Sequence, residues 1–313
     1  MLRLIQNEWM KLWSKKSSWI MAALLVVILF ASMGITKWVN STMDMGDETW
    51  QEIAANEQAN AEAMLMDPEL GAAQKEYYEG QAAIVEYRLA NEVPSFEYES
   101  MQQQVIDSHA MLSLVTLFTV IVAAGIVASE FSQGTIKMLL TRPVKRWKIL
   151  TSKYITTMIF AILLSILTIA VSALAGLIFF GIGDGTFLVW NGSEVVEGSY
   201  WIEALKLAVL SFASVWIIGT FAFMLGTVFR SSSLAIGLSI FLMFTGIQAV
   251  YLLANYEIVK YYLFTHTDLT QFYTGFMPVP DITMTMSLIV LAVYFIIFMA
   301  ISYWTFSRRD VTA

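Results

Sequence analysis

The chain has 313 residues, of which 58% are hydrophobic and only 14% are charged. Soluble domains carry about 25% charged residues, so this composition predicts that lipid is the main solvent of the chain. The absence of cysteine excludes a disulfide framework, a thiolate metal site and a cysteine nucleophile. Two histidines are too few for a histidine metal cluster, and no stretch is basic enough to predict nucleic-acid binding.

The first segment, 1–18, has apolar residues at helical spacing: Leu2, Ile5, Trp9, Leu12 and Trp13. This pattern predicts an amphipathic helix that lies in the inner membrane interface, with its tryptophans at headgroup depth. A simple extension of the first span is the alternative. The polar run 14–18 favours a separate interfacial helix.

Six apolar stretches are long enough to cross a bilayer, which takes about 20 residues of helix. They lie at 19–38, 111–129, 155–182, 204–229, 234–254 and 282–306. The first exceeds the apolar core of a signal peptide and has no clear cleavage site after it, which favours an uncleaved anchor. The predicted fold class is therefore all-α: a polytopic membrane protein with six transmembrane helices.

Charge is strongly segregated between the connections. With the N-terminus inside, 13 of the 18 lysines and arginines but only three of the 25 acidic residues fall on the inner face. The positive-inside rule therefore places both termini in the cytosol.

The connection after the first span, 39–110, is an extracytoplasmic loop that holds 15 acidic residues. Its Ala, Glu and Gln content favours helices, with breaks near Asp67 and Pro94. The triplet Asp67-Pro68-Glu69 is typical of a helix start. The acidity is explained by solubility and topology, or by a vestibule that attracts cations or cationic peptides.

The remaining connections are short. They comprise outer loops at 183–203 and 255–281, a cytosolic turn at 230–233 and a cytosolic tail at 307–313. The aromatic residues of 255–281 predict an interfacial belt.

The cytosolic segment 130–154 between the second and third spans is the most informative. Ile136, Leu139 and Leu140 share one face of a predicted short helix, Gly134 permits a sharp turn before it, and Pro143 ends it. An apolar ridge flanked by basic residues suits a groove on a soluble partner. A basic loop on anionic headgroups is the alternative.

The order of residues in this segment resembles the pattern of ABC-2-type permeases of ABC transporters, including bacterial permeases of the bacitracin-export and sodium-export types. The positions that match are Glu130, Gly134, Thr135, Leu139, Leu140, Pro143, Arg146 and Lys153. The resemblance implies a bacterial cytoplasmic membrane protein in which 134–140 is the coupling helix. The residues that it implies for docking an ATPase are Glu130, Gly134, Thr135, Ile136, Leu139, Leu140, Arg142, Pro143 and Arg146.

No glycine is followed by lysine, so the chain has no P-loop for ATP phosphates. It also has no H-E-x-x-H or G-x-S-x-G motif, which argues against an enzyme. We therefore expect no cofactor on this chain, and ATP and Mg on a partner. The resemblance implies two cytosolic ATPase subunits and a second permease protomer, identical or homologous, in the bilayer.

The spans have no charged residue near their middles, which disfavours an ion-coupled carrier. Polar candidates for lining a pathway are Ser165, Thr168, Ser172 and Gln248, although such hydroxyls more often bond to their own helix. We predict a permease that exports a hydrophobic or amphipathic substrate such as a peptide antibiotic. The alternatives are a membrane protein for sensing of, or immunity to, antimicrobial peptides, and a sodium-extruding permease.

Overall fold

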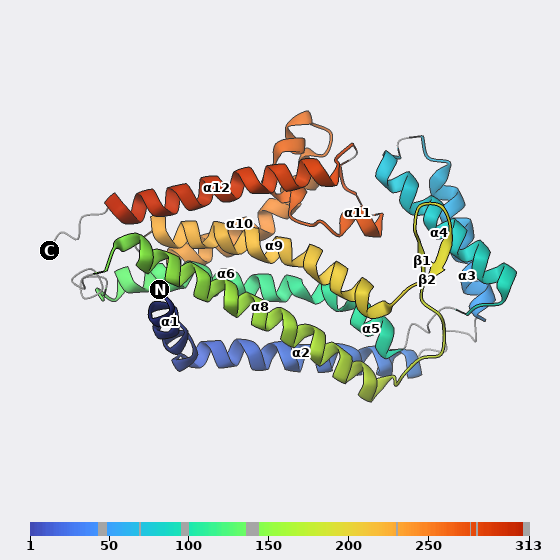
Figure 1. The fold of residues 1–313 in the computed structure, drawn as a ribbon, viewed down its shortest axis with the longest axis horizontal. Helices are drawn as coiled ribbons and strands as arrows, with labels where there is room; N and C mark the ends of the chain where they lie inside the picture. Colours follow the sequence, from blue (N-terminus) through green and yellow to red (C-terminus); the bar gives the residue numbers. More distant parts are fainter. Residues whose placement is uncertain are drawn as a thin grey trace.

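The computed structural model describes residues 1–42, 49–68, 70–94, 100–135, 144–229, 231–275, 277–279 and 281–308. In these ranges the protein is a bundle of long helices with a small helical layer at one end (Figure 1). Six helical segments are long and apolar enough to cross a membrane, which confirms the predicted fold class. They comprise α2 (Lys16–Thr42), α5 to α6 (Met101–Ser132), α8 (Arg146–Phe179), α9 (Tyr200–Val228), α10 (Ser232–Leu253) and α12 (Met284–Arg308).

The bundle is built around α6 (Leu112–Ser132). One apolar core joins it to α9, α10 and α12, and a second joins it to α1 (Leu2–Ser14), α2 and α8. A side chain at Gly226 of α9 would place its Cβ only 2.4 Å from the carbonyl oxygen of Ala124 of α6. The missing side chain therefore lets these two helices approach closely, as small residues do in membrane bundles.

The predicted N-terminal helix is present as α1, and it ends where the sequence turns polar. Lys15 has an extended backbone between α1 and α2, so α1 turns away from the long axis of α2 (Figure 1). Leu12 is buried, and the Trp13 ring packs edge-on against Trp19 and at a tilt against Phe160, so α1 is held against α2 and α8 rather than projecting freely.

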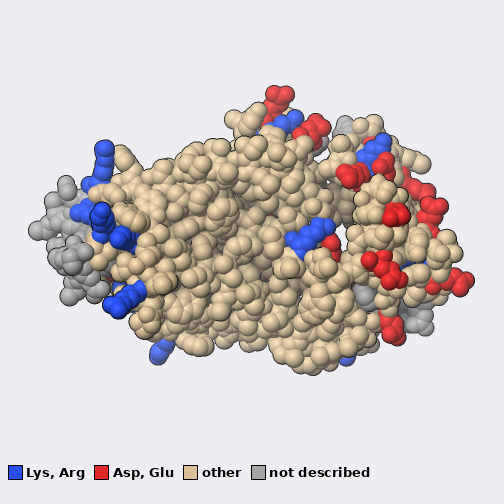
Figure 2. Space-filling model, viewed as in Figure 1, with Lys and Arg blue, Asp and Glu red and all other residues tan. Residues whose placement is uncertain are grey.

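The two ends of the bundle differ in charge. Lysines and arginines gather at the end that holds α1, and acidic residues gather at the opposite end (Figure 2). We call these the basic end and the acidic end. The acidic end comprises α3 (Trp50–Leu65), α4 (Ala72–Asn91) and an antiparallel hairpin of β1 (Leu188–Trp190) and β2 (Val195–Glu197), in which Val189 pairs with Val196.

The predicted breaks in the acidic connection are present, but one helix start is wrong. A capping box of Thr49 and Glu52 begins α3, which ends at Leu65. The sequence places the next start at Asp67-Pro68, whereas α4 begins at Ala72. There the backbone N–H of Gly71 donates to the side chain of Gln74, 3.2 Å away, so a capping contact further along the chain sets the boundary.

Short elements complete the acidic end. α5 (Met101–Asp107) and the 3-10 helix η1 (Ser108–Met111) lead into α6. The aromatic connection after α10 folds into η2 (Glu257–Tyr261), η3 (Leu263–His266) and α11 (Gln271–Thr274). His266 of η3 is fully buried between the hydroxyl of Ser287 and the carbonyl oxygen of Lys260, both 2.8 Å away, so it ties this connection to α12.

Candidate functional site

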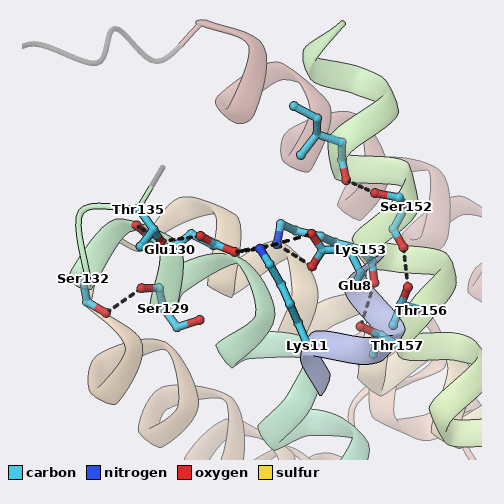
Figure 3. Close-up of polar contacts among 11 residues, drawn as sticks. Glu8, Lys11, Ser129, Glu130, Ser132, Thr135, Ser152, Lys153, Thr156 and Thr157 are labelled. Carbon is cyan, nitrogen blue, oxygen red and sulfur yellow. Dashed lines mark hydrogen bonds and ion pairs between the residues drawn. The ribbon is translucent and has the colours of Figure 1, made fainter. Parts of the chain in front are cut away.

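Four charged side chains from three helices meet at the basic end (Figure 3). They are Glu8 and Lys11 of α1, Glu130 near the end of α6, and Lys153 in the second turn of α8. We call these four residues the ionic cluster. Glu8, Glu130 and Lys153 are at most 9% exposed, whereas the Lys11 side chain is 45% exposed. Three charges that are almost removed from water are unusual in a protein interior and require mutual compensation.

Lys153 is the centre of the ionic cluster. Its Nζ lies 2.8 Å from Glu8 Oε2 and 3.1 Å from Glu130 Oε1. Lys11 Nζ reaches the same Glu130 oxygen at 3.2 Å and lies 3.8 Å from Glu8 Oε1. Two carboxylates thus face two ammonium groups, and the ionic cluster has no net charge. Bringing charges into a low dielectric is costly, and such pairing with direct hydrogen bonds offsets the cost.

The ionic cluster extends into the start of the connection between α6 and α8. The hydroxyl of Thr135 donates to the remaining carboxylate oxygen of Glu130 (Figure 3). Gly134 adopts φ of +71°, which glycine accepts without strain, so the predicted sharp turn is confirmed. The chain therefore leaves α6 through a turn that is fastened to the ionic cluster.

The return into α8 is also fastened. α8 begins at Arg146, nine residues before the predicted span at 155, so residues 146–154 of the segment 130–154 are helical. Arg146 donates from Nη1 to the carbonyl oxygen of Ser307 of α12, 2.9 Å away. Thr151 hydroxyl lies 2.6 Å from the hydroxyl of Tyr303, also of α12. The first turns of α8 thus contact α12 as well as the ionic cluster.

The predicted docking residues divide into two groups. The structure brings Glu130 and Thr135 together, with Gly134 in the turn between them, and places Arg146 against α12. Ile136, Leu139, Leu140, Arg142 and Pro143 lie outside the described residues. The docking role itself remains a prediction.

In the described part of the chain, three of the four predicted pathway residues are buried on α8, and the fourth, Gln248, lies apart from them on α10. Ser165 and Thr168 of α8 donate to the carbonyl oxygens of Ala161 and Leu164, both 2.9 Å away within their own helix. Ser172 is buried with no hydrogen-bond partner in the described part of the chain. Gln248 is exposed on α10.

Sequence reasoning missed Glu8, Lys11 and Lys153 as members of one site. Glu8 lies 145 positions from Lys153, and no local pattern joins them. A signal was nevertheless present: Glu8 and Glu130 are two of only three acidic residues on the predicted inner face. An acidic residue that persists among many basic ones is a candidate for a specific ion pair.

Comparison with known proteins identifies relatives without an assigned activity. Residues 72–312 match a family described as protein of unknown function, DUF2705. The uncharacterized protein YhcI of Bacillus subtilis is 37% identical over 318 aligned positions, which cover 99% of each chain. The uncharacterized membrane protein YdbK of the same organism is 31% identical over 63% of this chain and 78% of its own length.

Proposed function

This chain belongs to the DUF2705 family, and on that premise we propose that it is the membrane-spanning permease subunit of an ABC-type exporter whose ATPase is a separate chain. The proposal rests on one observation above all. The ionic cluster joins α6 and α8, the two helices that flank the connection 136–143, to each other and to α1. A push on that connection would therefore reach three helices together.

Rigidity is what a mechanical link of this kind requires. A basic loop that only touched headgroups would need no buried charges in the helices that flank it, because exposed lysines and arginines attract anionic lipid by themselves. Here Lys153 is 1% exposed and bridges two carboxylates from different helices. Breaking such a buried pair is costly, so the three helices are expected to move as one unit.

The proposal includes an orientation and an energy source. We assign the basic end to the cytosol, where an ATPase can reach the connection 136–143. The chain has no glycine followed by lysine, so ATP and Mg would bind to the partner. The complete transporter would contain two ATPases and a second permease protomer, identical or homologous.

The proposed cargo is hydrophobic or amphipathic, such as a peptide antibiotic. In the described spans, charged side chains lie near the helix ends, as do Lys16 and Lys37 of α2 and Arg308 of α12. α10 has no charged residue between Ser232 and Leu253. A pathway along these helices favours a cargo with substantial apolar surface.

Purification of the tagged full-length chain with an ABC ATPase encoded beside its gene tests the proposal. We expect a stable complex whose ATP hydrolysis drives accumulation of a labelled amphipathic peptide in inverted vesicles. The double substitution Leu139→Asp and Leu140→Asp should remove the ATPase. The matched control is Met64→Asp with Met66→Asp, two exposed apolar residues at the opposite end of the molecule.

Three results would contradict the proposal in different ways. Co-purification that survives the Leu139 and Leu140 substitutions would reject the docking assignment. A complex that binds peptide but never moves it would favour a sensing or immunity protein. ATP-driven movement of sodium without peptide would favour a sodium-extruding permease.

A further inference from the structure

A cavity of about 1440 Å³ lies between the acidic-end helices and the bundle. One wall consists of α3, α4 and the hairpin, and the other consists of the first turns of α9, α11 and the residues that lead into α12. Figure 2 shows the hollow that separates these two parts of the molecule. Pockets for drug-sized ligands measure about 300–1,000 Å³, so this cavity has room for a larger molecule.

Two close contacts at glycines shape the cavity: the first packs the hairpin onto α4 within one wall, and the second joins the two walls. A Cβ on Gly80 of α4 would lie 2.8 Å from the ring of Trp190 of β1, and one on Gly275, just after α11, would lie 2.4 Å from the ring of Tyr77 of α4. Gln74 also donates to the carbonyl oxygen of Gly275, 3.2 Å away. Because rings lie directly on backbone at both points, the cavity has a defined shape rather than a loose opening.

The cations in the lining are already engaged. Arg88 is 8% exposed, and its guanidinium donates to the carbonyl oxygens of Pro94 at 2.9 Å and Thr186 at 3.1 Å. Lys206 lies 3.1 Å from Glu203 and sits over the ring of Tyr273, 3.8 Å from its centroid. Neither cation is free to attract an anionic ligand.

The carboxylates in the lining outnumber the cations. The lining has four carboxylates and two cations: Glu57, Glu76, Glu203 and Asp281, and Arg88 and Lys206. Within the described residues, Glu57 and Glu76 have no ion pair within 4.0 Å, and Asp281 lies 3.9 Å from Lys260. Burial raises the pKa of Glu57, while the nearby positive charge of Arg88 acts in the opposite direction. The lining therefore keeps negative charge that a ligand can neutralise.

Aromatic rings complete the lining, from Trp50, Tyr77, Trp190, Phe272 and Tyr273. Aromatic faces attract cations and also bury apolar surface. The position of Lys206, between the carboxylate of Glu203 and the ring of Tyr273, shows how this cavity holds an ammonium group. Trp50 and Glu57 lie on the same face of α3, two helical turns apart, so this wall offers a ring and a carboxylate to different parts of one ligand.

We propose that this cavity binds a cationic amphipathic peptide, with amines at Glu57 and Glu76 and apolar side chains against the aromatic wall. The proposal stands whether or not the chain moves that peptide across a membrane. It uses the acidic end only, far from the ionic cluster and from any ATPase. Its failure and the failure of the transporter proposal are therefore separate results.

The direct test is binding of a short fluorescent peptide of lysine, leucine and tryptophan to the full-length chain in zwitterionic nanodiscs. Empty nanodiscs give the background from lipid. A peptide with glutamate in place of lysine is the matched probe of opposite charge. We expect saturable binding of the lysine peptide, measured by fluorescence anisotropy, and no saturable binding of the glutamate peptide.

Two double variants locate the site. Glu57→Gln with Glu76→Gln should weaken binding about tenfold, because each lost ion pair contributes up to about 1 kcal/mol and 1.4 kcal/mol is a tenfold change. Glu62→Gln with Glu86→Gln removes the same charge from exposed positions of the same two helices outside the cavity, and should change binding less than twofold. Equal loss in both variants, or equal binding of the glutamate peptide, would overturn the proposal.

Discussion

The basic end and the acidic end of this bundle differ in how their charged side chains are paired and exposed to water. At the basic end, each of the two ammonium groups of the ionic cluster lies within 4 Å of both carboxylates, and Lys153 is almost inaccessible to water. At the acidic end, four carboxylates and two cations line an open cavity, and in the described part of the chain Glu57 and Glu76 have no ion pair within 4.0 Å.

The difference teaches what each arrangement is suited for. A neutral, buried cluster has no remaining charge to offer a ligand, so it serves as a joint between helices. An open, acidic lining has charge that only a further molecule can neutralise, so it serves as a binding surface. The following predictions test this contrast, from the largest expected effect to the smallest.

Replacement of Lys153 by methionine should have the largest effect. It leaves Glu8 and Glu130 close together with only the half-exposed Lys11 beside them, and breaking a buried pair costs about 3–5 kcal/mol. The measurement is the free energy of unfolding from titration with SDS. Lys75→Met, which removes an exposed pair with Glu79, should cost less than about 1 kcal/mol. Equal losses would show that the ionic cluster is not a joint.

Replacement of Glu8 by glutamine should have a smaller effect on the same measurement. Lys153 keeps Glu130 as a partner, so the loss is that of one charged hydrogen bond, about 1.5–3 kcal/mol. The double variant Glu8→Gln with Lys153→Met should lose less stability than the sum of the losses of the two single variants, because both substitutions remove the same 2.8 Å contact. Strict additivity would mean that the two residues act independently.

Replacement of Gly275 by alanine tests the wall of the cavity. Gly275 and Gly192 both have positive φ, +69° and +95°, so alanine is strained at either position. Only at Gly275 does the new methyl group meet the ring of Tyr77, and we expect a further loss of about 1 kcal/mol or more from overpacking. The measurement is thermal unfolding followed by tryptophan fluorescence. Identical shifts in melting temperature for Gly275→Ala and Gly192→Ala would show that the Tyr77 ring moves aside without cost.

The pH dependence of stability should show the smallest effect. Burial raises the pKa of Glu57 above 4.5, so the folded chain holds this proton more tightly than the unfolded chain does. The stability contributed by the protonated carboxyl is therefore lost as pH rises through 4.5 and the raised pKa. Glu57→Gln should become more stable relative to the wild type between pH 4 and pH 7, by a small amount because the side chain is partly solvated.

The melting temperature across that pH range is the measurement. Glu62→Gln is the control, an exposed carboxylate on the same helix. A difference from wild type that is constant with pH, or equal for both variants, would contradict the assignment of Glu57 to a partly desolvated wall.

Much of the fold follows from local features of the sequence. The six spans are long apolar stretches, and the start of α1 and the turn at Gly134 follow from helical spacing and from glycine. The wrong helix start at Asp67-Pro68 has a local cause as well. Good capping residues there compete with a glutamine at 74 that caps Gly71, and propensity alone does not rank the two. The short hairpin at 188–197 has three residues in each strand, too few for a periodic signal.

The candidate site was only partly within reach of the sequence. Glu130 and Thr135 stand out because they match a family pattern, and the structure joins them directly. The partners Glu8 and Lys11 belong to the first helix, and nothing near them in the chain indicates Glu130. The acidity of 39–110 indicated a vestibule as one of two explanations, but the lining could not be predicted, since it comes from α3, α4, the hairpin, α9 and α11.

By itself, the sequence determined that this chain is a six-span membrane protein with charges of opposite sign at its two ends. The physical reason is that transfer of a helix into lipid depends on the residues of that helix alone. Only the tertiary structure decided which charges meet, because a buried ion pair depends on two side chains brought together from distant positions. Lys153 is the clearest case: its sequence position marks the start of a span, and its contacts with Glu8 and Glu130 make it the centre of a joint.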